Sequence, residues 1–310
     1  MQNLLKEFGI EYLESEIFFL CEGLSFHFDI NAFNQSKKLF FVFKTLSQLI
    51  ELFEQNTGLH FMQFGKSHNI QELLLSETPK PILAQVDTHL LKYYQRIDES
   101  EITIPEHTIL LYEIYEDKVR VGDPFVVNNQ GMADCYEGYV NIKDLQYGIS
   151  NYFCLSPNLN YIKLSEKSII QKIRSNLMQF TQKSEQNKHV TGMPALYHFL
   201  KTISNLPPYK VAEKYLWIET AFVLNGNMMF INDYLADILF QYSHCIRNSP
   251  SNIIKMISGI KNEWTYAYRL ILKIGYKRAE NLYPLVVNTL HRVLDLQNRC
   301  FDMIISCMEK

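Results

Sequence analysis

The sequence predicts an α+β protein in two parts, an α/β domain over residues 1–160 that holds an antiparallel sheet and an all-helical domain over residues 161–310. A chain of 310 residues is longer than one domain with a single hydrophobic core usually is. Short apolar runs separated by Gly, Pro and Asn fill residues 59–155, as in strands. Beyond Ser165, apolar residues recur every three or four positions, as in helices.

The first half of the chain is expected to pass from helices to strands. Apolar positions spaced by three and four predict that helices dominate residues 1–60, and one such stripe runs from Phe40 to Phe53. Four apolar runs then predict strands, at residues 59–64, 81–86, 108–114 and 119–121.

The second half is expected to consist of helices alone. The first helix ends near Phe180, and the polar residues 181–189 predict a linker. Pro194 and Pro284 suit the first turns of two later helices, because a proline at a helix start loses no hydrogen bond. Asn225-Gly226-Asn227 is expected to separate two further helices.

Composition argues against several classes of partner. Thirty basic and thirty-three acidic residues give a net charge of −3 without a basic block, which argues against nucleic acid. The apolar runs at residues 17–21 and 39–43 are too short to span a membrane. The first residues read as an amphipathic helix and not as a signal peptide, and the six cysteines form no disulfide framework. We therefore expect a soluble, cytoplasmic protein.

Residues 106–124 carry the pattern that is most informative about chemistry. Two apolar strands flank a polar turn at residues 115–118, which predicts a hairpin. His107 begins the first strand and Asp123 ends the second, so a register centred on Tyr115 places them on one face with Cβ atoms about 5 Å apart. A carboxylate there can orient an imidazole, as in a nucleophile, base and orienter triad. Two solvated residues at strand ends are the alternative.

The hairpin, with His107 before an apolar strand and Asp123-Pro124 after the second, resembles the second half of the papain-like fold in bacteriocin-processing cysteine peptidases. A narrower resemblance is to the family of butirosin biosynthesis protein H. It covers most of the chain, although each motif is short. The other segments that carry it are residues 9–10, 15–16, 21–26, 81–87 with Leu90 and Tyr93, 138–145, 226–230 and 233–237.

This resemblance implies a cysteine-dependent acyltransferase, or amide-forming enzyme, of natural-product and antibiotic biosynthesis. Such enzymes take an acyl or aminoacyl group from a carrier-protein thioester and deliver it to a small-molecule amine. A cysteine attacks the thioester, a histidine accepts its proton, and an aspartate orients the histidine. The last two roles fall to His107 and Asp123. The implied partners are an acyl carrier protein and the amine, no cofactor is implied, and a homodimer stays open.

The nucleophile is where this sequence departs from the family. The family's cysteine lies just before the helix that corresponds to residues 3–8, and no cysteine precedes that helix in this sequence. Cys21 is the substitute within reach, although it aligns with a small-residue position and has no glutamine just upstream to supply an oxyanion donor. An ordinary buried thiol is the alternative reading of Cys21.

Four further residues are candidates for substrate binding. His27 follows Cys21 closely, and Asp87 and His89 follow a strand, where loops often carry pocket residues. Tyr93 could form the wall of the same pocket, and surface exposure is the alternative for these side chains. The sequence has no Cys-x-x-Cys or His-Glu-x-x-His motif, so we expect no metal site.

Two other functions remain open. A relative that has lost its nucleophile would act as a binding or scaffold partner of a carrier protein or a synthetase. A thiol peptidase or thioesterase-type hydrolase would use the same residues with water as the acceptor.

Overall fold

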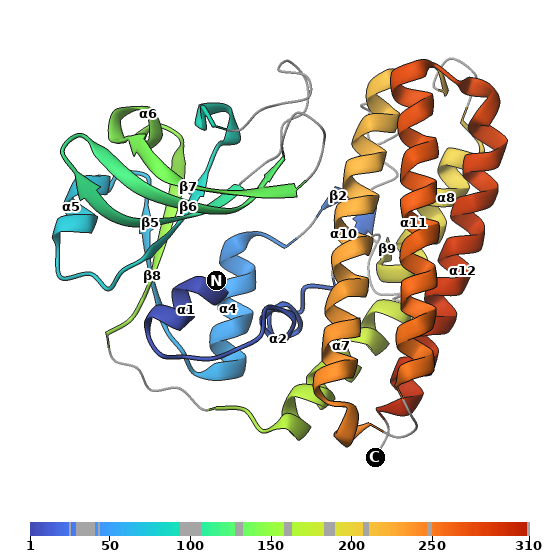
Figure 1. Cartoon of the computed structure of the whole chain (residues 1–310), viewed down its shortest axis with the longest axis horizontal. Helices are drawn as coiled ribbons and strands as arrows, with labels where there is room; N and C mark the ends of the chain where they lie inside the picture. The colour runs from blue at the N-terminus through green and yellow to red at the C-terminus, as the bar shows by residue number, and fades with distance from the viewer. Residues whose placement is uncertain are drawn as a thin grey trace. The chain divides into compact units, whose positions relative to one another are not determined.

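A computed structural model describes residues 1–24, 26–28, 41–42, 44–93, 107–127, 133–157, 163–182, 190–206, 211–246 and 250–308 (Figure 1). The chain forms two compact units. The sheet unit comprises Met1–Ile17 and Thr45–Lys163, and the helical unit comprises Phe18–Lys44 and Leu164–Lys310. The prediction of an α+β protein with an antiparallel sheet followed by a largely helical part is confirmed.

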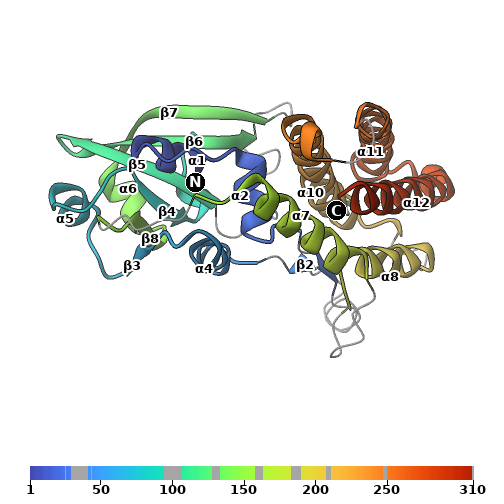
Figure 2. The same cartoon turned by 90° about the horizontal axis from the view of Figure 1, so that it is seen from below.

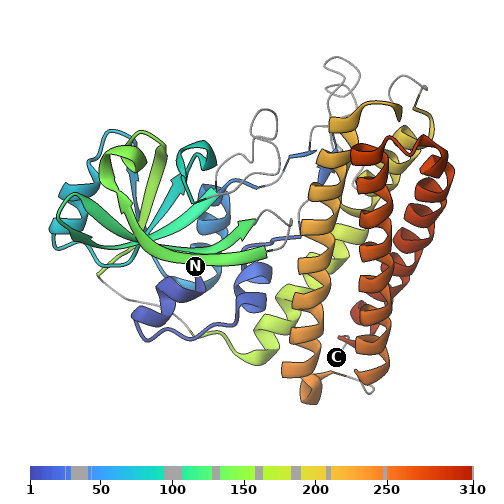
Figure 3. The same ribbon diagram turned by 45° about the horizontal axis from the view of Figure 1, so that its top comes forward.

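An antiparallel sheet forms the centre of the sheet unit (Figure 3). Its six strands follow the order β3-β8-β4-β5-β6-β7. All four predicted strands are present in it. Its strands are β3 (Phe61–Gly65), β4 (Ile82–Val86), β5 (His107–Tyr115), β6 (Lys118–Val127), β7 (Ala133–Asn141) and β8 (Ile149–Leu155). The helices of this unit are α1 (Gln2–Glu7), α4 (Leu46–Thr57), α5 (Ile70–Leu75), η1 (Thr88–Leu90) and α6 (Ile142–Gln146), and the boundary between the two units falls within α2 (Glu14–Leu20).

The central strand β4 is buried on both faces, which explains its continuous apolar run. Ile82, Ala84 and Val86 share one face and pack in a cluster with residues of the short helices α5 and α6. Leu83 lies on the opposite face and is also buried. The face shared by Ile82, Ala84 and Val86 carries the candidate active site at one end.

The helical unit is built from long helices that lie side by side (Figure 2). Its helices are α7 (Glu166–Thr181), α8 (Gly192–Ser204), α10 (Lys214–Gln241), η2 (Ser243–Cys245), α11 (Ser251–Lys277), η3 (Glu280–Leu282) and α12 (Tyr283–Cys307). Pro194 and Pro284 lie in first turns, as predicted. The linker expected at residues 181–189 lies mostly outside the described residues.

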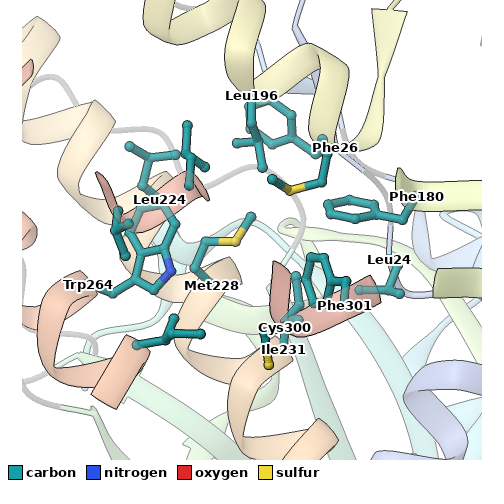
Figure 4. Packing of buried hydrophobic residues seen from close by; sticks show 14 of the residues in the cluster. Leu24, Phe26, Phe180, Leu196, Leu224, Met228, Ile231, Trp264, Cys300 and Phe301 are labelled. Atoms are coloured by element: carbon teal, nitrogen blue, oxygen red, sulfur yellow. The ribbon is translucent and has the colours of Figure 1, made fainter. Parts of the chain in front are cut away.

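Large apolar side chains fill the core of the helical unit (Figure 4). Trp264 and Phe301 are almost fully buried among them. Leu24 and Phe26, from early in the chain, lie in the same cluster beside Phe180. Burial of these residues explains why the segment Phe18–Lys44 belongs to this unit.

A small sheet lies in a stretch that was expected to be helical. It has the order β2-β1-β9 and consists of β1 (His27–Phe28), β2 (Phe41–Val42) and β9 (Val190–Thr191). The expected helical stripe from Phe40 is wrong at its start, because the helix begins at Leu46 after a Thr45 cap. The local apolar spacing is overridden because β2 pairs with β1, which in turn pairs with β9 from far along the chain.

The expected break at Asn225-Gly226-Asn227 is wrong, because α10 continues through these residues as a single helix. Gly within a helix costs about 1 kcal/mol relative to Ala. Leu224 and Met228 flank the three residues and are buried, so their packing offsets that cost. Among the described residues, no helix has the length and hydropathy needed to cross a membrane.

Candidate active site

His107 and Asp123 lie on two neighbouring strands of one hairpin. His107 is the first residue of β5 and Asp123 lies within β6. A two-residue turn, Glu116-Asp117, joins these strands, and Glu116 has a φ of 56°. A left-handed conformation of this kind is what tight hairpin turns require. The predicted hairpin is therefore confirmed.

A β-bulge interrupts β5 at Tyr112 and Glu113. Both of these residues stand against a single residue of β6, Arg120. The guanidinium of Arg120 lies 5.1 Å from the centre of the Tyr112 ring, and its Nη1 lies 3.5 Å from Oε1 of Glu113. Arg120 therefore contacts both residues of the bulge. An extra residue in one strand reverses the alternation of side chains beyond it.

The bulge sets the face on which His107 lies. Beyond it Leu110 pairs with Gly122, so the next residue of β6, Asp123, stands opposite Ile109. His107 is then a diagonal neighbour of Asp123 on the same face. The register therefore differs from the one predicted, which placed His107 directly opposite Asp123. Without the bulge, Asp123 would stand opposite Leu110 and His107 would lie on the other face.

The side chains of His107 and Asp123 are in direct contact, as predicted. Nε2 of His107 lies 2.8 Å from Oδ1 and 2.8 Å from Oδ2 of Asp123. The Asp123 side chain is fully buried, whereas 10% of the His107 side chain is exposed. The carboxylate therefore lies inside the protein, and the imidazole reaches from it towards the surface.

Tyr93 is the second residue that binds this carboxylate. Its hydroxyl donates a hydrogen bond of 3.1 Å to Oδ2 of Asp123. The ring of Tyr93 stacks on that of Tyr136, with centroids 3.8 Å apart and planes 3° from parallel. Tyr136 is the β7 residue opposite Asp123, and its ring extends over Gly138, where an added Cβ would come within 2.6 Å of the Tyr136 hydroxyl. A glycine at position 138 therefore leaves room for the stacked rings.

An apolar surface surrounds the acid and the imidazole. Val86 pairs with His107, and Ile109 lies opposite Asp123; both are almost fully buried. Tyr93 packs against the same apolar cluster. In such surroundings hydrogen bonds to a carboxylate are stronger than in water.

The arrangement suits general acid–base chemistry. When Nε2 donates its hydrogen to Asp123, Nδ1 is the basic nitrogen of the neutral ring. A buried carboxylate then orients the imidazole and stabilises it once it has accepted a proton. The contact between His107 and Asp123 is confirmed, and their catalytic role stays a prediction.

Cys21, the predicted nucleophile, belongs to the helical unit, whereas His107 belongs to the sheet unit. Only 4% of Cys21 is exposed, and this burial raises the pKa of its thiol to about 12. At neutral pH such a thiol is almost entirely protonated, because its pKa lies far above 7. Attack by Cys21 would therefore require a base, and its role stays a prediction.

The structure places the predicted binding residues in both units. Asp87 follows β4 in the sheet unit, is exposed, and donates its backbone N–H to the carbonyl of Gly148 at 2.9 Å. His89 lies in η1, and its side chain lies outside the described residues. His27 lies in β1 of the helical unit. Of the four, only Tyr93 has a described side-chain contact with the His107–Asp123 pair.

Sequence reasoning missed the link from Tyr93 to Asp123 and the part played by Tyr136. Tyr136 could have been found only from its place opposite Asp123, which depends on the register of β7. Sequence motifs also gave no hint of a cluster of side chains that could hold a metal ion, and the expectation of no metal site stays a prediction. Among the residues that the structure describes, Glu166, His244 and Cys245 of the helical unit form such a cluster.

Comparisons with known proteins do not assign this chain to a family. No protein-family model matches the chain, and a search of curated proteins returns no match.

Proposed function

We propose that this chain is an acyl-transfer enzyme that moves an acyl or aminoacyl group from a carrier-protein thioester to an amine. His107 is the general base and Asp123 orients it. One observation carries the proposal, the contact of 2.8 Å between Nε2 of His107 and the buried carboxylate of Asp123. A buried acid bound to a partly exposed imidazole is the arrangement that tunes a base for proton transfer.

The step that needs a base is the attack of the amine on the thioester. The amine nitrogen attacks the thioester carbonyl carbon, and Nδ1 of His107 takes the proton that the nitrogen loses as the C–N bond forms. The C–S bond then breaks, and His107 gives this proton to the departing thiolate. The products are an amide and the free thiol of the carrier, and Asp123 stabilises the imidazolium between the two steps.

The resemblance to the butirosin biosynthesis protein H family supports the same reaction class. It suggests a papain-like type for the N-terminal part and a place in cytoplasmic antibiotic biosynthesis. It also suggests a covalent route, in which Cys21 first takes the acyl group from the carrier and the amine then displaces it. We keep this route separate from direct attack by the amine, because the two differ in whether an acyl-enzyme forms.

A second function is favoured by the burial of Cys21. A thiol whose pKa is raised to about 12 by burial is a poor nucleophile, as expected of a relative that binds a carrier protein or a synthetase without catalysis. In that case the His107–Asp123 pair would be a structural remnant.

Turnover of model thioesters separates these functions. The chain is incubated with acyl and aminoacyl pantetheine thioesters and a panel of amines, and amide and acid products are measured by mass spectrometry. We expect His107→Ala to lower amide formation by about 10²–10⁴-fold, the usual contribution of a general base. His68→Ala is the matched control, because His68 is an exposed histidine of the same unit.

The outcomes are distinct. Equal turnover in His107→Ala and His68→Ala would contradict the proposal. No turnover together with binding of a carrier protein would support the second function, and acid as the sole product would identify a hydrolase. An acyl adduct in intact-mass spectra that is lost in Cys21→Ala would establish the covalent route.

A further inference from the structure

Three side chains of different chemistry converge in the helical unit, apart from the candidate active site. Glu166 lies in the first turn of α7, and His244 and Cys245 lie in η2, 78 and 79 residues later in the chain. Nε2 of His244 lies 2.9 Å from Oε2 of Glu166, and Sγ of Cys245 lies 3.4 Å from the same oxygen. All three ligand atoms lie within 4.8 Å of one another.

These separations are close to those in a tetrahedral metal site. Zinc binds thiolate sulfur at about 2.3 Å and histidine nitrogen or carboxylate oxygen at about 2.0–2.2 Å, so tetrahedral ligand atoms lie about 3.3–3.6 Å apart. Small rotations of the side chains would bring the observed distances of 2.9 and 3.4 Å to these values. An imidazole, a thiolate and a carboxylate favour zinc over magnesium or calcium, which prefer oxygen ligands.

We propose that Glu166, His244 and Cys245 bind a zinc ion, with water as the fourth ligand. The side chains of Glu166 and His244 are more than half exposed, so an ion reaches them from solvent. Binding replaces the proton on Sγ of Cys245, which is released to solvent. The ion links the start of α7 to η2, the short helix that follows α10. This site does not depend on the proposed acyl transfer.

Cobalt(II) is a direct probe, because it takes the same ligands as zinc and a cobalt–thiolate bond gives a charge-transfer band in the near ultraviolet. The full chain, stripped with a chelator, is titrated with cobalt(II) and then with zinc. We expect one ion per chain, a thiolate band that saturates, and loss of the band when zinc displaces cobalt.

Matched variants assign the ligands. Cys245→Ser should abolish the thiolate band, and His244→Asn should weaken zinc binding by more than about 100-fold, since loss of a ligand's supporting partner alone costs about 10–100-fold. Cys135→Ser is the control, because Cys135 is an exposed cysteine of the sheet unit. Zinc should also raise the melting temperature of the wild type and of Cys135→Ser, but not that of His244→Asn.

Two results would overturn the proposal. One is the absence of saturable cobalt binding by the wild type, which would leave an ion pair between His244 and Glu166 with a thiol beside it. The other is a thiolate band that survives in Cys245→Ser but disappears in Cys135→Ser.

Discussion

Both units of this protein bury polar side chains, but they do so in different ways. In the sheet unit, buried Asp123 is bound to Tyr93 and to His107, whose imidazole is partly exposed. In the helical unit, Asn232 and Gln297 exchange two hydrogen bonds of 2.8 and 3.0 Å and are fully buried.

The helical network is closed on itself. The indole of Trp264 donates to Oε1 of Gln297 at 3.1 Å, so α10, α11 and α12 each contribute one side chain. Such a satisfied network specifies how helices pack. The network around Asp123 instead includes the imidazole of His107, which is partly exposed, and we call it the open network. We propose that the open network serves chemistry and that the closed one serves packing.

The largest expected effect is on activity in the sheet unit. Asp123→Asn should lower acyl transfer by about 10²–10⁴-fold, because a neutral amide lacks the negative charge that stabilises the imidazolium. Steady-state turnover measures the effect. Asp117→Asn is the control, since Asp117 is exposed in the turn of the same hairpin. Similar turnover in both variants would mean that the open network has no catalytic role.

The next effect is on stability in the helical unit. Gln297→Leu should lower the free energy of unfolding by about 2–4 kcal/mol, because Asn232 and Trp264 each lose a buried partner. Acyl transfer should be unchanged at temperatures where the variant is folded. Denaturant unfolding measures the loss.

A double variant sharpens this test. Replacing both Asn232 and Gln297 by Leu removes the pair together, so part of the stability should return. If the double variant is less stable than Gln297→Leu, the closed network is not the source of the loss.

A smaller effect is expected at Tyr93. Tyr93→Phe removes the hydrogen bond to Asp123 but keeps the ring that stacks on Tyr136. We expect a loss of about 2 kcal/mol in the free energy of unfolding, typical of a hydrogen bond to a charged group. Tyr136→Phe, which leaves both the stack and this hydrogen bond in place, serves as the control. An equal loss in the two variants would show that the hydrogen bond to Asp123 contributes little.

The smallest effect, when it is expressed per pH unit, concerns the buried thiol of Cys21, whose pKa is raised from 9.0 to about 12 by burial. Between these values the folded state keeps a proton that the unfolded state has lost, so stability falls as pH rises. This thiol alone should contribute a slope of about 1.4 kcal/mol per pH unit. The slope should therefore be shallower in Cys21→Ala, while Cys135→Ala, which changes an exposed thiol, should match the wild type. Identical slopes in the wild type and Cys21→Ala would mean that Cys21 is not buried as described.

Local patterns predicted the hairpin of the candidate site but not its register. The apolar runs and the polar turn identified the two strands that bear His107 and Asp123. The bulge at Tyr112 and Glu113 has no signal in apolar spacing, because it depends on how Arg120 and its neighbours pack across the strands. His107 and Asp123 were therefore correctly predicted to lie on one face, but the predicted register differs from the one in the structure.

Contacts between distant segments account for the other differences. The strand β1 pairs with β9 from much later in the chain, and no local pattern announces such a partner. Glu166 is separated by 78 residues from His244, far beyond the spacing of any short metal motif. Packing on both sides of Gly226 likewise holds α10 together where the sequence favoured a turn.

The most direct test of His107 as an oriented base is nitrogen NMR of the imidazole in its neutral form. The structure predicts a hydrogen on Nε2 that exchanges slowly with solvent and a bare Nδ1, with these signals absent in His107→Ala. In Asp123→Asn the Nε2 hydrogen should exchange faster. A neutral ring with its hydrogen on Nδ1 and none on Nε2, or exchange that Asp123→Asn leaves unchanged, would contradict the assignment of His107 as a base held by Asp123.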